Sequence, residues 1–383
     1  MTFEYTADQI SLCDSVRKML KEIATPEYIR ATDREGRYPY EVYDGFVKLG
    51  LIAMAFPEAY GGLGGDLMDF VAVSEEIGKV SYDYLGGYGT SVFNGINLLH
   101  NGSEEQKRLY IPKLINGEIR MSIAMTEPGA GSDAGAMRTT AKLDGDHWVL
   151  NGQKVFSTGS GARDTVISLY AKTDSTVNYK KGISLFLIDN TTPGLELRKL
   201  DTLGRRSIGT YEIFLDNVRV PADRLVGEVN QGWRYMLSGL QLERMMTTAG
   251  YCGASQSVVD LAVKYATERV QFGQPIGNFQ ALAHMLADMQ TEVEAARMLM
   301  LKAAWEVANK RDALKTLSMA KLFASETYIK AANNGMQIMG GYGYIMEYDM
   351  QRHFREARST TIAAGTSQMQ RNIIARQMGL NPR

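Results

Sequence analysis

The apolar pattern changes twice along the chain, and this change limits the folds that the sequence can adopt. Residues 1 to about 118 carry apolar side chains at helical spacing, residues from about 119 to 228 contain short β-rich runs, and helical spacing returns from about 229. At 383 residues the chain is also too long for one simple core. We therefore predict an α+β fold with three domains, covering residues 1–118, 119–228 and 229–383.

Helix-start signals define the first of these domains. Thr6 and Gln9 are spaced as a capping box before a run of apolar residues at helical spacing, and Ser103 and Gln106 repeat the same device. The glycine-rich stretch 60–65 separates helices with a loop. The sequence thus predicts an N-terminal helical domain.

The middle part has strand signals without intervening helices. The run HWVLNGQKVF, residues 147–156, places the strong turn dipeptide Asn151-Gly152 between two β-rich runs and predicts a hairpin there. Further strands are expected at residues 165–172, 183–189 and 210–220. Such a pattern is typical of an antiparallel barrel or sandwich, and we predict a middle antiparallel β-barrel domain.

The last part is helical again. One apolar stripe continues from Leu282 to Val307, and helices are also expected at residues 231–268, 315–339 and 366–378. Four helices of this kind predict a C-terminal four-helix bundle.

Composition excludes several classes of function. The chain has 42 Lys and Arg against 43 Asp and Glu, which argues against nucleic-acid binding and requires any anionic ligand to meet local positive groups. Its two cysteines and four dispersed histidines predict neither a disulfide framework nor a metal site. The sequence has neither a signal-peptide pattern nor an apolar run of 18 residues, so we expect a cytoplasmic enzyme without a membrane span.

Two glycine-rich segments could approach a ligand closely. In AMTEPGAGSD, residues 124–133, Thr126 and Ser132 offer hydroxyl groups, and Gly131 frees backbone amides, although an ordinary loop with a capping Ser132 explains the segment equally well. In QIMGGYGY, residues 337–344, two glycines end a helix and also leave bare backbone on which a pyrophosphate or ring could rest. Arg269 could neutralise a phosphate, or could be a solvated surface arginine.

Six motifs follow one another along the chain: AMTEPGAGSD, NGQKVFSTG, FLDNVRVP, RVQFGQPIGNFQ, QIMGGYGY and GTSQMQR. In this order they resemble the acyl-CoA dehydrogenase family of flavoenzymes, over essentially the whole chain. The resemblance implies an N-terminal helical domain, a middle β-domain and a C-terminal four-helix bundle. It also implies FAD between the last two domains, in part against a neighbouring subunit, and hence a dimer or a dimer of dimers.

The resemblance assigns roles to particular positions. Thr126 and Thr158 would hydrogen-bond the flavin ring, Phe156 would pack on it where the family often has tryptophan, and Ser132 would meet the pyrophosphate or the CoA chain. Met125 and Gly131 belong to the same cofactor-binding turn. The ADP part of FAD would be held by Arg269, Gln271, Phe272, Gln280, Gln337, Gly340, Gly341, Thr366 and Gln368.

The catalytic base needs a separate argument. Many family members have a glutamate immediately before the Gly-Thr of the last motif, where this chain has Ala364. A second arrangement, similar to the isovaleryl and long-chain branches, takes the base from a sequence like LERxxxA, and Glu243 occupies that position. On a helix Glu243 has no basic neighbour three or four residues away, and apolar neighbours disfavour a charged carboxylate, which suits a base. The alternative is a solvated or interdomain glutamate. Arg244 would suit the CoA portion.

The resemblance therefore implies FAD-dependent α,β-dehydrogenation of an acyl-CoA to the trans-2-enoyl-CoA, within fatty acid or amino acid catabolism. Electrons would pass to an electron-transferring flavoprotein. Two alternatives stay open. The segment 28–50 resembles the crotonobetainyl-CoA reductase branch about as well, which would make the protein an enoyl-CoA reductase. A DNA-binding or protective relative without dehydrogenation is a further reading, against which the net charge of −1 counts.

Overall fold

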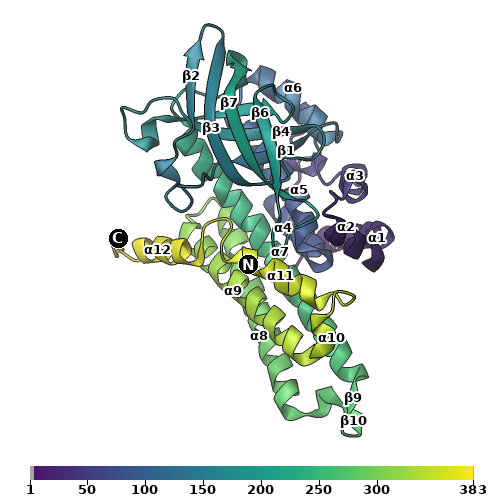
Figure 1. Ribbon diagram of the computed structural model, residues 1–383. Coiled ribbons are helices and arrows are strands. Elements are labelled where there is room, and N and C mark those ends of the chain that lie inside the picture. The colour runs from purple at the N-terminus through teal and green to yellow at the C-terminus, as the bar shows by residue number, and fades with distance from the viewer. Residues whose placement is uncertain (1–3, 383) are drawn as a thin grey trace. The chain divides into compact units, whose positions relative to one another are not determined.

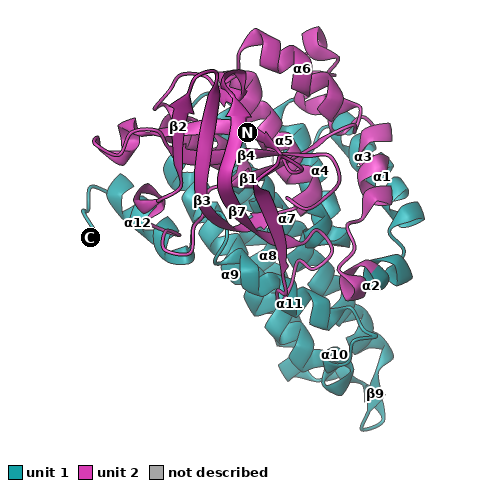
Figure 2. Ribbon diagram, turned by 45° about the horizontal axis from the view of Figure 1, so that its top comes forward, with its two compact units in different colours: residues 1–31, 66–85, 244–383 teal, residues 32–65, 86–243 magenta. Residues whose placement is uncertain are grey.

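The computed structural model describes residues 4–382 of the chain (Figure 1). The chain divides into two compact units (Figure 2). The helical unit comprises residues 1–31, 66–85 and 244–383, and the sheet unit comprises residues 32–65 and 86–243. One boundary between the units falls within the helix α7 Gly232–Glu268, between Glu243 and Arg244.

The N-terminal part is helical, as predicted. Both predicted capping boxes form: the Thr6 side chain accepts from Gln9 N at 3.2 Å, and the Ser103 side chain accepts from Gln106 N at 3.2 Å. These caps satisfy backbone donors that the first turn leaves without a partner. The helices are α1 Ala7–Ile23, α2 Pro26–Glu35, α3 Tyr40–Lys48, α4 Leu67–Val80, α5 Tyr82–Asn101 and α6 Glu104–Ile115.

The middle part forms one mixed sheet within the sheet unit. Its strands are β1 Arg120–Ala124, β2 Thr140–Asp144, β3 His147–Thr158, β4 Thr165–Lys172, β5 Ile183–Asp189, β6 Leu195–Leu200, β7 Thr210–Pro221 and β8 Leu225–Val226. The strand order is β6-β7-β3-β2-β4-β5-β8, with β1 beside β4. Side chains of β3, β4, β5 and β7 form the core, where Trp148 and Phe186 pack edge to face at 5.4 Å between ring centroids.

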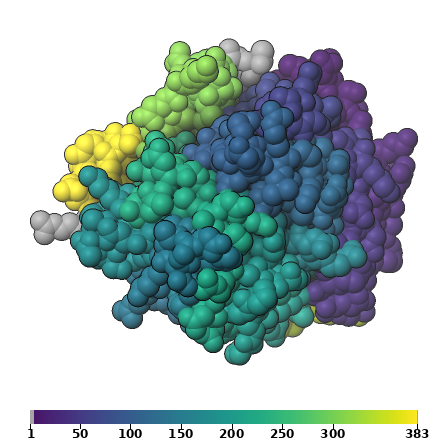
Figure 3. Space-filling model, turned by 90° about the horizontal axis from the view of Figure 1, so that it is seen from above, coloured from purple at the N-terminus to yellow at the C-terminus, as the bar shows by residue number. Residues whose placement is uncertain are grey.

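The sheet corrects the prediction of an antiparallel β-barrel in two respects. It does not close, because the strand path ends at β6 on one side and at β8 on the other. It is not wholly antiparallel either, since both β1 and β2 pair with β4 in parallel. The residues of the edge strand β6 are half-buried or exposed throughout. Figure 3 shows the molecular surface as seen from above in the view of Figure 1.

The predicted hairpin turn at Asn151-Gly152 is also wrong. Strand β3 runs through these residues, and the turn lies earlier, between Asp144 and His147, which pair across it. Gly152 instead marks a register shift against β7, with φ of 146°. A Cβ there would lie 2.5 Å from Thr139 Oγ1, so this glycine permits a close approach of neighbouring strands.

The C-terminal part is helical, as predicted. Its helices are α7 Gly232–Glu268, α8 Gln280–Ala308, α9 Leu314–Met339, α10 Gly341–Tyr344, α11 Met350–Thr360 and α12 Ser367–Gln377. In the helical unit α9 packs against α8, α11 and α12. Helix α11 was not predicted, because it buries Arg352, His353 and Glu356 in place of an apolar stripe. Within residues 4–382, the helices are too short or too polar to cross a membrane.

Candidate functional site

The loop between β1 and β2 carries the first group of predicted site residues. Met125 and Thr126 are half-buried at its start, whereas Gly131 and Ser132 are exposed. A Cβ added at Gly131 would meet nothing within 4 Å, so the backbone there is open to a ligand. Lys154 and Glu127, which the sequence analysis did not single out, form a buried ion pair at 2.8 Å next to the start of this loop.

Phe156 and Thr158 lie near the end of β3. The register of β3 against β7 shifts between Lys154 and Ser157, and Phe156 in this bulge has φ of 60° with 64% of its surface exposed. Bulges re-aim side chains, and a bulky residue in the left-handed region is strained. Strained backbone of this kind is found mainly at functional sites, so the exposed ring of Phe156 is a candidate for ligand contact. Thr158 is half-buried and pairs with Thr210 of β7.

Glu243 is half-buried in the N-terminal third of α7. Burial raises the pKa of Tyr170 in β4, the Asn97 hydrogen bond lowers it, and the charge of Glu243 raises it further. Asn97 donates to Tyr170 Oη and to the Tyr235 carbonyl, each at 3.2 Å. One turn before Glu243, a Cβ at Gly239 would lie 2.9 Å from Asn97 Nδ2. The charge of Glu243 thus acts on Tyr170, and helix α7 approaches Asn97 of α5 closely at Gly239.

In the helical unit, most of the residues assigned to the ADP part line one groove of about 670 Å³. Its predicted members are Arg269, Gln271, Phe272, Gln337, Gly340 and Gly341. The other lining residues are Tyr265, Ile276, Phe279, Leu282, Ile338, Met339, Tyr342 and Ile345. This volume is within the range of small-molecule sites, about 300–1,000 Å³. A cation, aromatic rings and bare glycine backbone therefore meet in one place.

The groove is built on a short hairpin and a helix end. Strands β9 Val270–Gln271 and β10 Gln274–Pro275 enclose a two-residue turn, Phe272-Gly273, whose φ angles are 51° and 80°. Phe272 is 94% exposed. The Arg269 guanidinium carbon lies 5.6 Å from the ring centroid of Tyr342. At the end of α9, Gly340 has φ of 57° and ψ of −135°, a conformation that favours glycine.

The remaining predicted residues of the ADP part do not line this groove. Gln280 is exposed at the start of α8. Thr366 caps α12, its hydroxyl accepting from Met369 N at 3.1 Å, and Gln368 is exposed in the first turn. These residues lie at helix N-termini, where backbone N–H groups favour anions.

Arg244 contacts the segment that precedes α12. Its Nε donates to the Ala364 carbonyl at 3.3 Å, and Lys321 Nζ donates to the Gly365 carbonyl at 2.7 Å. Ala364 has φ of 53°, an unusual backbone for alanine. Two cations thus fix the backbone at the position where the sequence lacks a glutamate.

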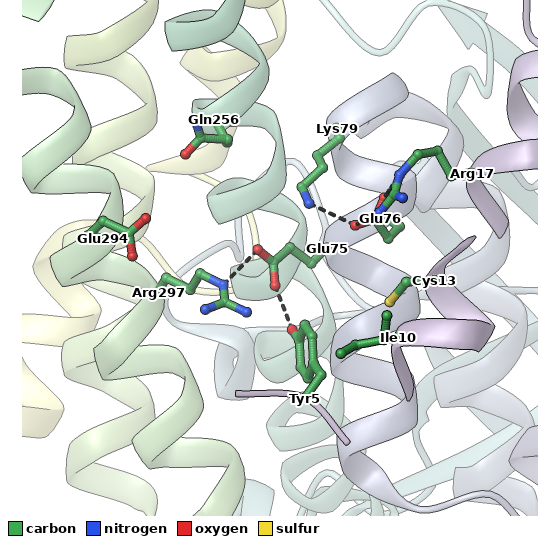
Figure 4. Close-up of a pocket in the computed structure, with 10 residues that line it drawn as sticks. All are labelled: Tyr5, Ile10, Cys13, Arg17, Glu75, Glu76, Lys79, Gln256, Glu294 and Arg297. Atoms are coloured by element: carbon green, nitrogen blue, oxygen red, sulfur yellow. Dashed lines mark hydrogen bonds and ion pairs between the residues drawn. The ribbon is translucent and has the colours of Figure 1, made fainter. Parts of the chain in front are cut away.

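A second, smaller cavity of about 260 Å³ lies elsewhere in the helical unit (Figure 4). Buried Glu75 accepts from Tyr5 Oη at 2.5 Å and from Arg297 Nε at 2.9 Å. Its neighbour Glu76 is paired with Arg17 and Lys79. These acidic and basic side chains are paired with one another, and the residues that line the cavity come from α1, α4, α7 and α8 and from Tyr5.

Models of known protein families match the chain in three consecutive segments. The family models for the N-terminal, middle and C-terminal domains of acyl-CoA dehydrogenases match residues 6–118, 122–218 and 230–379. The chain belongs to the acyl-CoA dehydrogenase family. It is similar to the probable acyl-CoA dehydrogenase YngJ of Bacillus subtilis, with 39% identity over 99% of this chain and 100% of the relative.

Two further relatives of this acyl-CoA dehydrogenase family member are informative. The CarC subunit of the caffeyl-CoA reductase-Etf complex of Acetobacterium woodii is 39% identical over 94% of this chain and 96% of its own. The structure of a glutaryl-coenzyme A dehydrogenase with glutaryl-CoA has a TM-score of 0.94 and 36% identity, over 100% of this chain and 98% of that one. The protein is accordingly an FAD-dependent oxidoreductase of acyl-CoA thioesters that acts on CH–CH groups. Across residues 4–382, His, Cys, Asp and Glu side chains do not gather into a group that could hold a metal ion.

Proposed function

We propose that this family member oxidises the Cα–Cβ bond of an acyl-CoA to the trans-2-enoyl-CoA, with Glu243 as the catalytic base. The observation that carries the assignment is the pair of positions 243 and 364. Ala364 has no ionisable group, whereas Glu243 is a half-buried carboxylate on a helix, in the segment LQLERMMTTAG, residues 240–250.

The residues present fit FAD. The groove of the helical unit offers Arg269 for a phosphate, exposed Phe272 and Tyr342 for stacking, and bare backbone at Gly340 and Gly341, where a Cβ would meet nothing within 4 Å. Because Phe272 extends into solvent from a tight turn, it suits a cofactor held by a neighbouring subunit. In the sheet unit, Met125, Thr126, Gly131, Ser132, Phe156 and Thr158 would hold the flavin end.

The proton transfer follows from the chain's own residues. The thioester acidifies the α-carbon, and Glu243 removes that proton. Bound FAD supplies the acceptor for the β-hydride at its N5 atom. The charge of Glu243 acts on Tyr170, which accepts a hydrogen bond from Asn97, and this polar surrounding supports the assignment. The assigned position resembles that of the isovaleryl and long-chain branches.

Arg244 and Ser132 are the proposed contacts for the CoA portion. A guanidinium carries a permanent positive charge and five N–H donors in a planar group, which suits a phosphate or carbonyl of CoA. Ser132 is exposed in the same loop as the Glu127–Ala130 backbone bridge, so its hydroxyl is open to a ligand.

The proposed assembly is a dimer or a dimer of dimers in the cytoplasm. The exposed aromatic groove supports it, since half of each cofactor site would lie on a neighbouring chain. We propose an electron-transferring flavoprotein as the acceptor, because the CarC relative is named as part of a complex with Etf. We also propose domains that cover residues 1–118, 119–228 and 229–383, which the separate matches of the three family models to residues 6–118, 122–218 and 230–379 support.

The experiment that tests this proposal is a titration of the purified, FAD-loaded protein with a panel of acyl-CoAs and an artificial electron acceptor. Straight, branched and aromatic acyl groups should be included. At least one should bleach the oxidised flavin and turn over with the acceptor. A colourless protein that takes up no added FAD would contradict the proposal.

A second candidate function is enoyl-CoA reduction. The similarity to the caffeyl-CoA reductase subunit favours it, as does the resemblance of residues 28–50 to a reductase branch. Assays in both directions separate the two: a dehydrogenase oxidises acyl-CoA with an electron acceptor, and a reductase consumes enoyl-CoA with a reduced dye. The direction with the larger kcat/KM for the same substrate pair identifies the function.

A further inference from the structure

Lys154 is a fully buried lysine in the middle of β3. Its side chain is 0% exposed, and its ammonium nitrogen has three neighbours that can accept: Glu127 Oε1 at 2.8 Å, the Met125 carbonyl at 3.2 Å and Met137 Sδ at 3.9 Å. Burying a charge costs free energy unless it is paired and hydrogen-bonded. Here each N–H of the ammonium group has an acceptor in the loop between β1 and β2.

Glu127 completes this arrangement from within the loop. Its Oε1 also accepts from Thr139 N at 2.9 Å, and its Oε2 accepts from Arg138 N at 2.5 Å. Glu127 is near the first residue of the loop, and Arg138 and Thr139 are its last. The Glu127 carboxylate thus connects the two ends of the loop by hydrogen bonds, and Lys154 connects the loop to β3.

The ion pair lies next to residues that are proposed to bind the flavin. Lys154 binds the carbonyl of Met125, and the next residue of β3, Val155, donates its N–H to the carbonyl of Thr126 at 2.9 Å. Phe156 follows immediately in its strained bulge. Two consecutive residues of the loop are therefore attached to two consecutive residues of the strand.

We propose that the Lys154–Glu127 pair is a positioning device that holds Thr126 and Phe156 in the geometry that the flavin ring requires. This inference rests on the proposed function, because it takes the flavin roles of Thr126 and Phe156 from it. The exposed part of the loop contains Pro128, Gly129 and Gly131, and a Cβ at either glycine would meet nothing within 4 Å. Its placement depends on its anchored ends.

Overall stability does not explain the pair. Replacing a buried ion pair by apolar residues of similar volume is often neutral or stabilising, whereas removing one partner is costly. Burial lowers the pKa of Lys154 to about 8 although Glu127 raises it, so the charged form is kept at a cost. What the pair provides, and an apolar pair does not, is a set of directed bonds to Met125, Arg138 and Thr139.

The test compares Lys154→Met with Lys142→Met, an exposed lysine of β2 in the same sheet. FAD affinity is measured by reconstitution of FAD-free protein, together with the flavin absorption spectrum and the melting temperature. Lys154→Met should weaken FAD binding about tenfold or more, since lost hydrogen bonds to charged groups are worth that much. It should also change the flavin spectrum, and Lys142→Met should leave both unchanged.

A double-mutant cycle with Thr126→Ala separates positioning from a structural role. If Lys154 acts through the loop, Thr126→Ala should cost much less FAD affinity in the Lys154→Met background than in the wild type. A full, additive effect of Thr126→Ala, or a wild-type spectrum and affinity in Lys154→Met, would overturn the inference. Should Lys154→Met not fold, Glu127→Gln/Lys154→Met, which buries neither charge, undergoes the same measurements.

The outcome also distinguishes this inference from the proposed function. If the wild-type protein takes up no FAD, the proposed function is wrong. If the wild type binds FAD and Lys154→Met binds it equally well with the same spectrum, only the positioning role is wrong.

Discussion

We expect Phe272 to lower the stability of the turn that it occupies and to strengthen the binding of the cofactor. The two-residue turn Phe272-Gly273 has positive φ at both positions, which is the geometry of a type I′ turn. Asn-Gly is the preferred pair for this turn, whereas a non-glycine residue pays about 1–2 kcal/mol in the left-handed region. Phe272 buries almost nothing in return, because 94% of its surface is exposed.

The predicted magnitude comes from comparing two variants that both lack the aromatic ring of residue 272, so that the loss of its contacts is the same in each. Phe272 packs edge to face on Phe279 at 6.2 Å between centroids, and both Phe272→Asn and Phe272→Leu remove that contact. Only asparagine enters the left-handed region readily. The free energy of unfolding of Phe272→Asn should therefore be about 1 kcal/mol higher than that of Phe272→Leu. Both variants should retain less FAD than the wild type.

Urea unfolding of FAD-free protein at several protein concentrations measures this difference, because bound cofactor and assembly would otherwise raise the apparent stability. FAD retention is measured on the same samples by absorbance after gel filtration. Equal stability of the Asn and Leu variants would refute the argument from backbone strain. Wild-type FAD retention in both would refute the cofactor role of Phe272.

Three further outcomes are expected. Arg269→Ala should lower FAD retention and weaken assembly, which absorbance and sedimentation would detect; normal FAD content in a folded variant would count against that role. Burial and the charge of Arg352 lower the pKa of His353 well below its usual value, so the unfolded chain binds a proton below pH 6.5 that the folded chain does not. Stability should fall by up to about 1.4 kcal/mol per pH unit from this group as the pH drops below 6.5. His353→Asn should lessen that fall in urea unfolding at pH 7 and 5.5, and the exposed control His284→Asn should not. Ala364→Glu combined with Glu243→Gly should recover part of the turnover that Glu243→Gly alone loses, and no recovery would show that the two positions do not reach the same α-carbon.

Local signals in the sequence predicted local structure well. The capping boxes at Thr6 and Ser103 form because they depend only on residues three positions apart. The groove residues Arg269, Phe272 and Gly340 were identified through the family motifs, and the structure brings them together. Their exposure and positive φ angles were not readable from the sequence.

Pairing between distant segments was less predictable. The turn dipeptide Asn151-Gly152 does not make a hairpin, because β3 pairs with β2 up to Asn151 and continues past it in pairing with β7. Whether the sheet closes into a barrel depends on whether its two edge strands pair. No local sequence pattern predicts that β6 and β8 lie at opposite ends of the strand order. Lys154 was missed since a lysine in an alternating strand usually faces solvent, and only the fold places Glu127 beside it.

The most direct test of the account is anaerobic stopped-flow reduction of the flavin by acyl-CoA in Glu243→Gln. The change removes the base and keeps the shape of the side chain, so FAD content and the spectral change on acyl-CoA binding should be retained. The rate of flavin reduction should fall by about 10²–10⁴, the usual contribution of a general base. Glu268→Gln, at the exposed end of the same helix α7, is the matched control and should reduce at the wild-type rate. Wild-type reduction in Glu243→Gln would contradict the assignment of Glu243 as the catalytic base.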